Sequence, residues 1–281
     1  MEVSPEVQDE GVKREGGITM VEKNDVITFL DDVIKQFEQF SLEHNPSGKV
    51  DTQSWDTPMG RLDVMKSSGD MFEKAGLIYC DLAIETPPVL ADKLGQQGSK
   101  AQVYVLEINF YPHNPFIPRG YIELRVNITD TIVLAGGTDI FPYFSQSDED
   151  STFFADAMKA LCSSHGQDYN QLRKTRADFF VSQYRKEKVG SHAGIYSFQL
   201  EEKDFTFFKG MADAFFQCYG EIIERGKSRP YTPEDVERKL LIHGIWTQWV
   251  LLEDEGTKYG LQKGIPPDAL LGGILPPRAT F

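Results

Sequence analysis

Residues 102–128 read QVYVLEINFYPHNPFIPRGYIELRVNI, and this stretch decides the fold class. Odd-numbered positions 103–109 carry Val, Val, Glu and Asn, whereas even-numbered positions 104–110 carry Tyr, Leu, Ile and Phe. Side chains alternate across a strand, so this pattern predicts a strand with two different faces. Residues 121–128 alternate in the same way, and the prolines of residues 111–118 exclude a central strand between the two. The stretch therefore predicts two strands joined by a Pro-rich connection.

The flanking sequence predicts helices and strands that follow no regular repeat. Before the stretch we expect a helix that begins at Asn24–Asp25 and stops at residues 45–48, a loop to residue 69, a helical turn at 69–76 and a strand at 77–84. After it we expect a short strand at 131–135, helices at 148–165, 168–186 and 204–226, a strand at 194–200, a helix that starts at Thr232 and a last strand at 246–252.

These elements predict one α+β domain over residues 23–281, with a mainly antiparallel sheet covered by helices; an α/β arrangement stays open on periodicity alone. Residues 1–22 are acidic and polar, and we interpret them as a disordered N-terminal arm.

Composition excludes several classes of protein. With 43 acidic and 29 basic residues, the chain has a formal net charge of −14, which disfavours binding to nucleic acid. We find no signal peptide and no window apolar enough for a membrane span. The three cysteines are far apart and form no disulfide framework, which favours a reducing compartment such as the cytoplasm, or an organelle interior if a targeting segment was removed. The scattered histidines and cysteines predict no metal site.

Four segments, taken in order, carry a family resemblance. The chain resembles the oxygen-dependent coproporphyrinogen III oxidases in Phe72–Gly76 followed by Pro87–Pro88, in Tyr111–Pro118 with Arg125, in Gly136–Tyr143 with His165–Tyr169, and in Gly256–Gln262 with Leu275–Pro277. The resemblance implies a large, flat antiparallel sheet sandwiched between helices, in a homodimer. It also implies a cleft in which molecular oxygen serves to convert two propionates of coproporphyrinogen III into vinyl groups, with no metal or organic cofactor.

The same resemblance implies roles for individual residues. Asp139 matches an aspartate whose carboxylate would accept hydrogen bonds from the pyrrole N–H groups; read alone, it would cap a turn after Gly136–Gly137. Arg125 and Asn114 match residues beside the substrate, although a surface arginine and an Asn-Pro turn are the simpler interpretations. Further candidate substrate-binding residues are Arg185, Lys258 and His243; a solvated charge run is the alternative for Arg185, and a hairpin residue is the alternative for Lys258.

Departures from the family pattern gather where the chemistry is expected. Tyr111 replaces a histidine, and because tyrosine titrates near pH ~10 it would donate a proton or form a radical rather than act as a base. His113 is the candidate to replace that histidine. Arg119 and Tyr121 replace a threonine and a histidine, and His243, Ile245, Gln248 and Val250 also depart from the pattern.

Four functions therefore stay open. The first is the family's own reaction, with Asp139, Tyr111 and His113 as catalytic residues. The second is a reaction on another tetrapyrrole, a porphyrinogen or a bilin, in which Tyr111, His113 and His243 take new roles. A non-catalytic tetrapyrrole carrier and an unrelated interaction module are the third and fourth.

Overall fold

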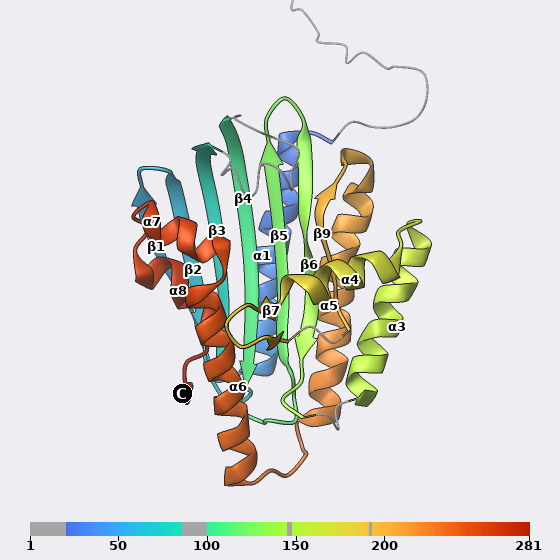
Figure 1. Ribbon diagram of the computed structural model, residues 1–281, viewed down its shortest axis with the longest axis vertical. Coiled ribbons are helices and arrows are strands. Elements are labelled where there is room, and N and C mark those ends of the chain that lie inside the picture. Colours follow the sequence, from blue (N-terminus) through green and yellow to red (C-terminus); the bar gives the residue numbers. More distant parts are fainter. Residues whose placement is uncertain (1–20, 86–99, 145–147, 191–192) are drawn as a thin grey trace, which may run out of the picture.

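The computed structural model describes residues 21–85, 100–144, 148–190 and 193–281. At its centre lies a seven-stranded sheet in the order β1-β2-β3-β4-β5-β6-β9, in which every neighbouring pair is antiparallel (Figure 1). The strands are β1 (Val50–Thr57), β2 (Gly60–Ser67), β3 (Phe72–Glu85), β4 (Lys100–Pro112), β5 (Arg119–Ile128), β6 (Ile132–Phe141) and β9 (Ile195–Leu200). A short separate hairpin pairs β7 (Val181–Ser182) with β8 (Glu187–Lys188).

Helices cover both faces of the sheet. One face packs against α1 (Lys23–His44), α3 (Asp148–Ser164) and α5 (Phe205–Gly226), and the other against α6 (Pro233–Leu252), α7 (Glu255–Gln262) and α8 (Pro267–Ile274). Helix α4 (Tyr169–Phe179) lies over the end of the sheet at β9. Figure 1 shows the sheet with α7 and α8 in front and α1 behind. The predicted antiparallel sheet between helices is therefore confirmed.

The alternation in β4 separates the two layers. Its even-numbered residues 104–110 belong to the large core beneath α1, α3 and α5, where the Phe110 ring lies 5.0 Å from Phe72 and 5.2 Å from Phe40. Its odd-numbered residues 103–107 face a cavity beneath α6, α7 and α8. One face of this strand thus stabilises the fold, whereas the other is available for function.

Several local predictions are confirmed. Helix α1 and helix α5 lie within two residues of their expected ranges. At the start of α6, the Thr232 hydroxyl accepts a hydrogen bond from the backbone N–H of Asp235, and the Asp235 carboxylate accepts one from the backbone N–H of Thr232, which is the capping box that the sequence indicates.

Three local predictions are wrong. The expected loop at 49–69 is the hairpin of β1 and β2; because β1 is an edge strand with mostly exposed residues, its polar sequence hides the strand. The expected helical turn at 69–76 is instead the start of β3 at Phe72. The expected strand at 246–252 continues α6, because Trp246, Trp249 and Val250 all fall on one buried helical face.

Other predicted elements have different bounds in the structure or fall partly outside the described residues. The strand expected at 131–135 is β6, which continues to Phe141. Helix α4 ends at Phe179 rather than at residue 186, and the expected turn after Gly136–Gly137 is the middle of β6. Most of the predicted N-terminal arm, together with Pro87–Pro88, lies outside the described residues. Within the described part, none of the helices combines the length and apolar character needed to cross a membrane.

Candidate functional site

A cavity of about 160 Å³ lies between the sheet and the layer of α6, α7 and α8. Its walls are apolar and aromatic, with Phe180, Trp246 and Trp249 on one side and Ile78, Cys80 and Leu82 of β3 on the other. Its polar side chains include Glu107 of β4, Glu123 and Arg125 of β5, Tyr196 of β9, and Asp254 between α6 and α7. An apolar pocket with a few convergent polar groups is the usual form of a binding site for a small molecule.

The strand register brings these polar groups together. Glu107 lies opposite Glu123 in the β4–β5 pair, and Tyr196 lies opposite Gly137 in the β6–β9 pair. Glu123 accepts hydrogen bonds from Arg125 Nη2 (2.7 Å), the Tyr121 hydroxyl (2.8 Å) and the Tyr196 hydroxyl (3.3 Å). Three donors therefore fix the position of the Glu123 side chain at the floor of the cavity.

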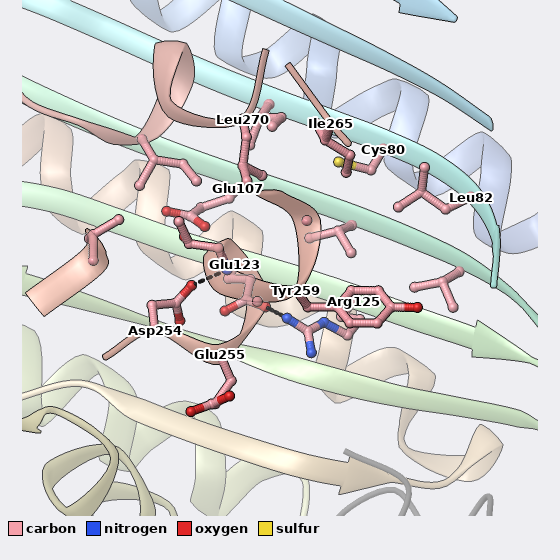
Figure 2. Close-up of a pocket in the computed structure, with 18 of the residues that line it drawn as sticks. Cys80, Leu82, Glu107, Glu123, Arg125, Asp254, Glu255, Tyr259, Ile265 and Leu270 are labelled. Atoms are coloured by element: carbon pink, nitrogen blue, oxygen red, sulfur yellow. Dashed lines mark hydrogen bonds and ion pairs between the residues drawn. The ribbon is translucent and has the colours of Figure 1, made fainter. Parts of the chain in front are cut away.

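Two further acids lie close to Glu123 and are less well compensated. Burial, and then repulsion from Glu123, raises the pKa of Glu107 to about 8, although the Asn109 amide donates to its carboxyl at 2.8 Å. Burial also raises the pKa of Asp254, which accepts a hydrogen bond from the backbone N–H of Thr257 at 2.7 Å. Figure 2 shows Glu107, Glu123 and Asp254 near one another, with the Arg125 guanidinium directly beside Glu123.

This arrangement favours a ligand that brings hydrogen-bond donors. The charge of Arg125 is already matched by Glu123, so the floor offers little attraction to a further anion. A group with several N–H donors would instead be held by oxygen acceptors in surroundings of low dielectric constant.

Asp139 lies on the same face of the sheet but is fully buried. Its Oδ1 accepts backbone N–H bonds from Ile140 and Gly194, both at 2.8 Å, and its Oδ2 lies 3.4 Å from Arg176 Nε of α4. The Arg176 guanidinium stacks on the Phe180 ring, 3.5 Å from its centroid. Phe180 lines the cavity, Arg176 lies behind it, and Asp139 lies behind Arg176. The carboxyl group of Asp139 itself is therefore enclosed and does not reach the cavity.

Tyr111 and His243 come together near the C-terminal tail. Their rings meet edge to face at 5.3 Å, and the Tyr111 hydroxyl donates to the carbonyl oxygen of Ile274. Burial raises the pKa of Tyr111 to about 12. His243 Nε2 lies 2.8 Å from the Tyr143 hydroxyl and Nδ1 lies 3.0 Å from the carbonyl oxygen of Arg278, while burial lowers the pKa of His243 to about 3.

Four other predicted residues lie away from this cavity. His113 lies beside Glu73 near the turn at Gly69, and the Asn114 amide holds the α5–α6 connection by donating to the carbonyl oxygens of Gly226 and Arg229. Arg185 pairs with Glu187 on the β7–β8 hairpin. Lys258 pairs with Glu255 on α7, which corrects the hairpin interpretation of Lys258.

Of the eight predicted site residues, the structure thus places only Arg125 among those that line this cavity. Sequence reasoning missed Glu107, Glu123, Asp254 and Tyr196. A signal for two of them was present, since Glu107 and Glu123 are acids at alternating positions of strands whose other faces are apolar. In the described part of the chain, no cluster of three or more His, Cys, Asp or Glu side chains has the geometry of a metal site.

Comparisons with known proteins agree with this architecture. The family profile described as coproporphyrinogen III oxidase matches residues 23–281. A protein of Rickettsia bellii (strain OSU 85-389) is 28% identical over 256 residues, which cover 87% of this chain and 91% of the relative. Proteins of Rickettsia akari (28% over 260 residues) and Rickettsia conorii (27% over 259 residues) each cover 88% of this chain and 92% of the relative. All three are named oxygen-dependent coproporphyrinogen-III oxidase.

Proposed function

The chain belongs to the coproporphyrinogen III oxidase family, and from this premise we propose that it catalyses the oxygen-dependent oxidative decarboxylation of coproporphyrinogen III. In each of two steps, a propionate side chain loses CO₂ and a hydride equivalent and becomes a vinyl group. Oxygen accepts the two electrons and the proton released at each step. Neither a metal nor an organic cofactor is part of this proposal.

The observation that carries the proposal is the acidic floor of the aromatic cavity. A porphyrinogen is a reduced tetrapyrrole whose four pyrrole rings all carry N–H donors. Glu123, held in place by hydrogen bonds from Arg125 and two tyrosines, can accept these N–H groups and can stabilise positive charge that develops on a pyrrole as it is oxidised. Glu107 and Asp254 supply further oxygen atoms next to it.

The residues expected from the sequence take more limited roles in this proposal. Arg125 positions Glu123 and orients the ring. Asp139 can bind a pyrrole only if Arg176 moves, so its first role is to anchor α4 over the sheet. Tyr111, with its raised pKa, would act as a hydrogen-bond donor rather than a base. His113, Asn114, Arg185, Lys258 and His243 remain candidates that a rearranged substrate complex would have to bring closer.

Substrate binding requires the cover of the cavity to move. The cavity volume of about 160 Å³ is below the roughly 300–1,000 Å³ that is usual for pockets of drug-sized ligands. A tetrapyrrole is at least as large as a drug-sized ligand, so the cavity as it stands is too small for it. Since α7 and α8 are short helices on the outer side of the cavity, they are the elements whose outward movement would open it.

We also propose a cytoplasmic homodimer. The dimer rests on membership of the family. The compartment rests on the three free and buried cysteines, Cys80, Cys162 and Cys218, which suit a reducing environment.

The test is anaerobic addition of coproporphyrinogen III followed by air, with oxygen uptake and product mass measured together. Loss of two CO₂ per substrate, at a rate reduced at least tenfold by Glu123→Gln, would support the proposal. Asp139→Asn tests the enclosed aspartate in the same assay. Glu221→Gln on the far side of the protein, where Glu221 pairs with Arg225, is the control and should react like the wild type.

Other results would redirect the assignment. Binding of coproporphyrinogen III without loss of CO₂ would reject the family reaction and point to another tetrapyrrole substrate or to a carrier. Absence of binding would reject a tetrapyrrole function and leave the interaction module.

A further inference from the structure

A second cavity, of about 320 Å³, lies next to the first and shares Trp246 with it. Its lining differs in charge: the basic side chains are Arg119, Lys188 and Arg238, and the single acid, Glu187, is already paired with Arg185. In a protein with a formal net charge of −14, such a local excess of positive charge calls for an explanation.

Arg119 is the unusual member of this lining. It is 2% exposed, and its guanidinium carbon lies 3.8 Å from the ring centroids of both Phe141 and Trp246. Its Nη1 donates to Asn109 Oδ1 at 3.0 Å, whereas Nη2 has no hydrogen-bond partner among the described residues. Arg125 and Arg176 each have a carboxyl group within salt-bridge distance, from Glu123 and Asp139. Among the described residues, Arg119 has no such partner.

A buried cation without a counter-ion is costly, so buried charges in proteins are normally paired. The Phe141 and Trp246 rings both lie against the Arg119 guanidinium, and their centroids are 5.7 Å apart, so they border it on adjacent sides. Because the N–H groups of a guanidinium lie in its plane, a new hydrogen bond to Nη2 forms at its edge. A carboxylate is planar and matches this edge, and charge-assisted bonds of this kind are the strong ones.

We propose that this second cavity is a carboxylate subsite, in which Arg119 binds a ring carboxylate of the tetrapyrrole and thereby determines specificity. The nature of the ligand rests on the proposed function. The two cavities are complementary to such a ligand: the floor of the first offers oxygen acceptors to ring N–H groups, while the basic cavity beyond Trp246 receives a carboxylate.

The supporting groups fit this role. Arg238 Nε donates to the carbonyl oxygen of Tyr143 at 3.1 Å, which holds this second cation at the cavity, and Lys188 reaches it from β8. Phe141, Tyr143, Phe144 and Trp246 supply apolar walls for the carbon atoms of a propionate. His243 also lines the cavity, and with its neutral ring it adds no positive charge.

The experiment compares two ligands that differ only in their carboxylates, coproporphyrinogen III and its tetramethyl ester. Both are titrated without oxygen, with tryptophan fluorescence as the readout, because Trp246 lines both cavities. Arg119→Gln should weaken binding of the free acid about 10- to 100-fold and leave binding of the ester unchanged. Arg119→Lys, which keeps the charge, should restore part of the affinity for the acid.

Arg61→Gln is the matched control, since Arg61 is an exposed arginine on β2 that lines neither cavity. It should change neither affinity. An Arg119→Gln variant that binds the acid as well as the wild type, or that loses acid and ester equally, would overturn the subsite. So would a wild-type protein that does not bind the acid. If Arg119→Gln selectively loses binding of the acid while the wild type takes up no oxygen in the aerobic assay, the subsite is kept and only the decarboxylation is rejected.

Discussion

His243 is a neutral imidazole inside the protein, between the Tyr143 hydroxyl and the carbonyl of Arg278. Because burial lowers its pKa to about 3, while an unfolded histidine titrates near ~6.5, the unfolded state binds more protons between these two values. The stability that this residue contributes is therefore present above pH ~6.5 and is lost as the pH falls toward 3.

The first prediction concerns the free energy of unfolding of the wild type relative to that of His243→Gln. The stability advantage of the wild type should decrease by up to ~1.4 kcal/mol for each pH unit below pH ~6.5. Urea denaturation of both proteins between pH 4 and 8 measures it. The comparison must use the difference, because Glu107 has a raised pKa and contributes stability that is lost as the pH rises, the opposite direction. A difference that does not change with pH would contradict the buried neutral ring.

At the scale of elements, Gly244 of α6 holds the C-terminal tail in place. A Cβ at this position would collide with the carbonyl oxygen of Thr280, and the Thr280 N–H donates to the carbonyl oxygen of Leu240 at 3.0 Å. Helix and tail are therefore in backbone contact, which only glycine permits here.

The second prediction compares two glycine-to-alanine changes in helix interiors. Gly244→Ala should lower the free energy of unfolding by ~1–3 kcal/mol, because the tail has to move. Gly220→Ala in α5 should raise it by up to ~1 kcal/mol, since its Cβ would meet Phe40 Cε2 at an ordinary 3.4 Å and alanine favours the helix. Denaturation and amide hydrogen exchange of residues 275–281 measure both effects, and faster exchange is expected only for Gly244→Ala.

Strands with one apolar face and one polar face could be predicted from the sequence, whereas an exposed edge strand and a helix with strand-like composition could not. Strands β4 and β5 were predictable because one face is apolar throughout. Strand β1 was not, since both of its faces are largely exposed, and residues 246–252 have strand-like composition but are held in α6 by burial of Trp246 and Trp249.

The site was less predictable than the fold because it depends on contacts between distant segments. Asp139 was expected to face the ligand, but Arg176, 37 residues later, encloses its carboxyl group, and this contact is not encoded in any local pattern. Arg119 follows Pro118 in the Pro-rich connection, where a surface position is the simple expectation, yet Phe141 and Trp246 enclose it.

On the scale of the whole molecule, the two layers divide stability and function between them. The layer beneath α1, α3 and α5 contains the phenylalanine-rich core, the layer beneath α6, α7 and α8 contains the first cavity, and α6 also lines the second. Strand β4 contributes side chains to each, so one strand allows the two roles to be tested separately.

The third prediction uses the two faces of β4. Phe110→Ala should lower the free energy of unfolding by ~3–5 kcal/mol, because Phe110 is fully buried among other aromatic rings. Val105→Ala, on the cavity face of the same strand, should cost less than ~1.5 kcal/mol, because its side chain already borders open space. Denaturation without ligand measures both variants. If Phe110→Ala and Val105→Ala lost the same free energy of unfolding, the cavity face of β4 would contribute as much to stability as its core face.

The order of the strands has a consequence for how the chain folds. From β1 to β6, each strand pairs with the next strand in the sequence, so the sheet can grow by local hairpins that close early. The pairing of β6 with β9 instead spans α3 and α4 and must close a much longer loop, which makes it a late event. Because α4 carries Arg176 and the turn before β9 supplies the Gly194 N–H, we expect Asp139 to stay in contact with water until β9 has paired. The most deeply buried charge of the sheet is thus desolvated only when its partners have arrived.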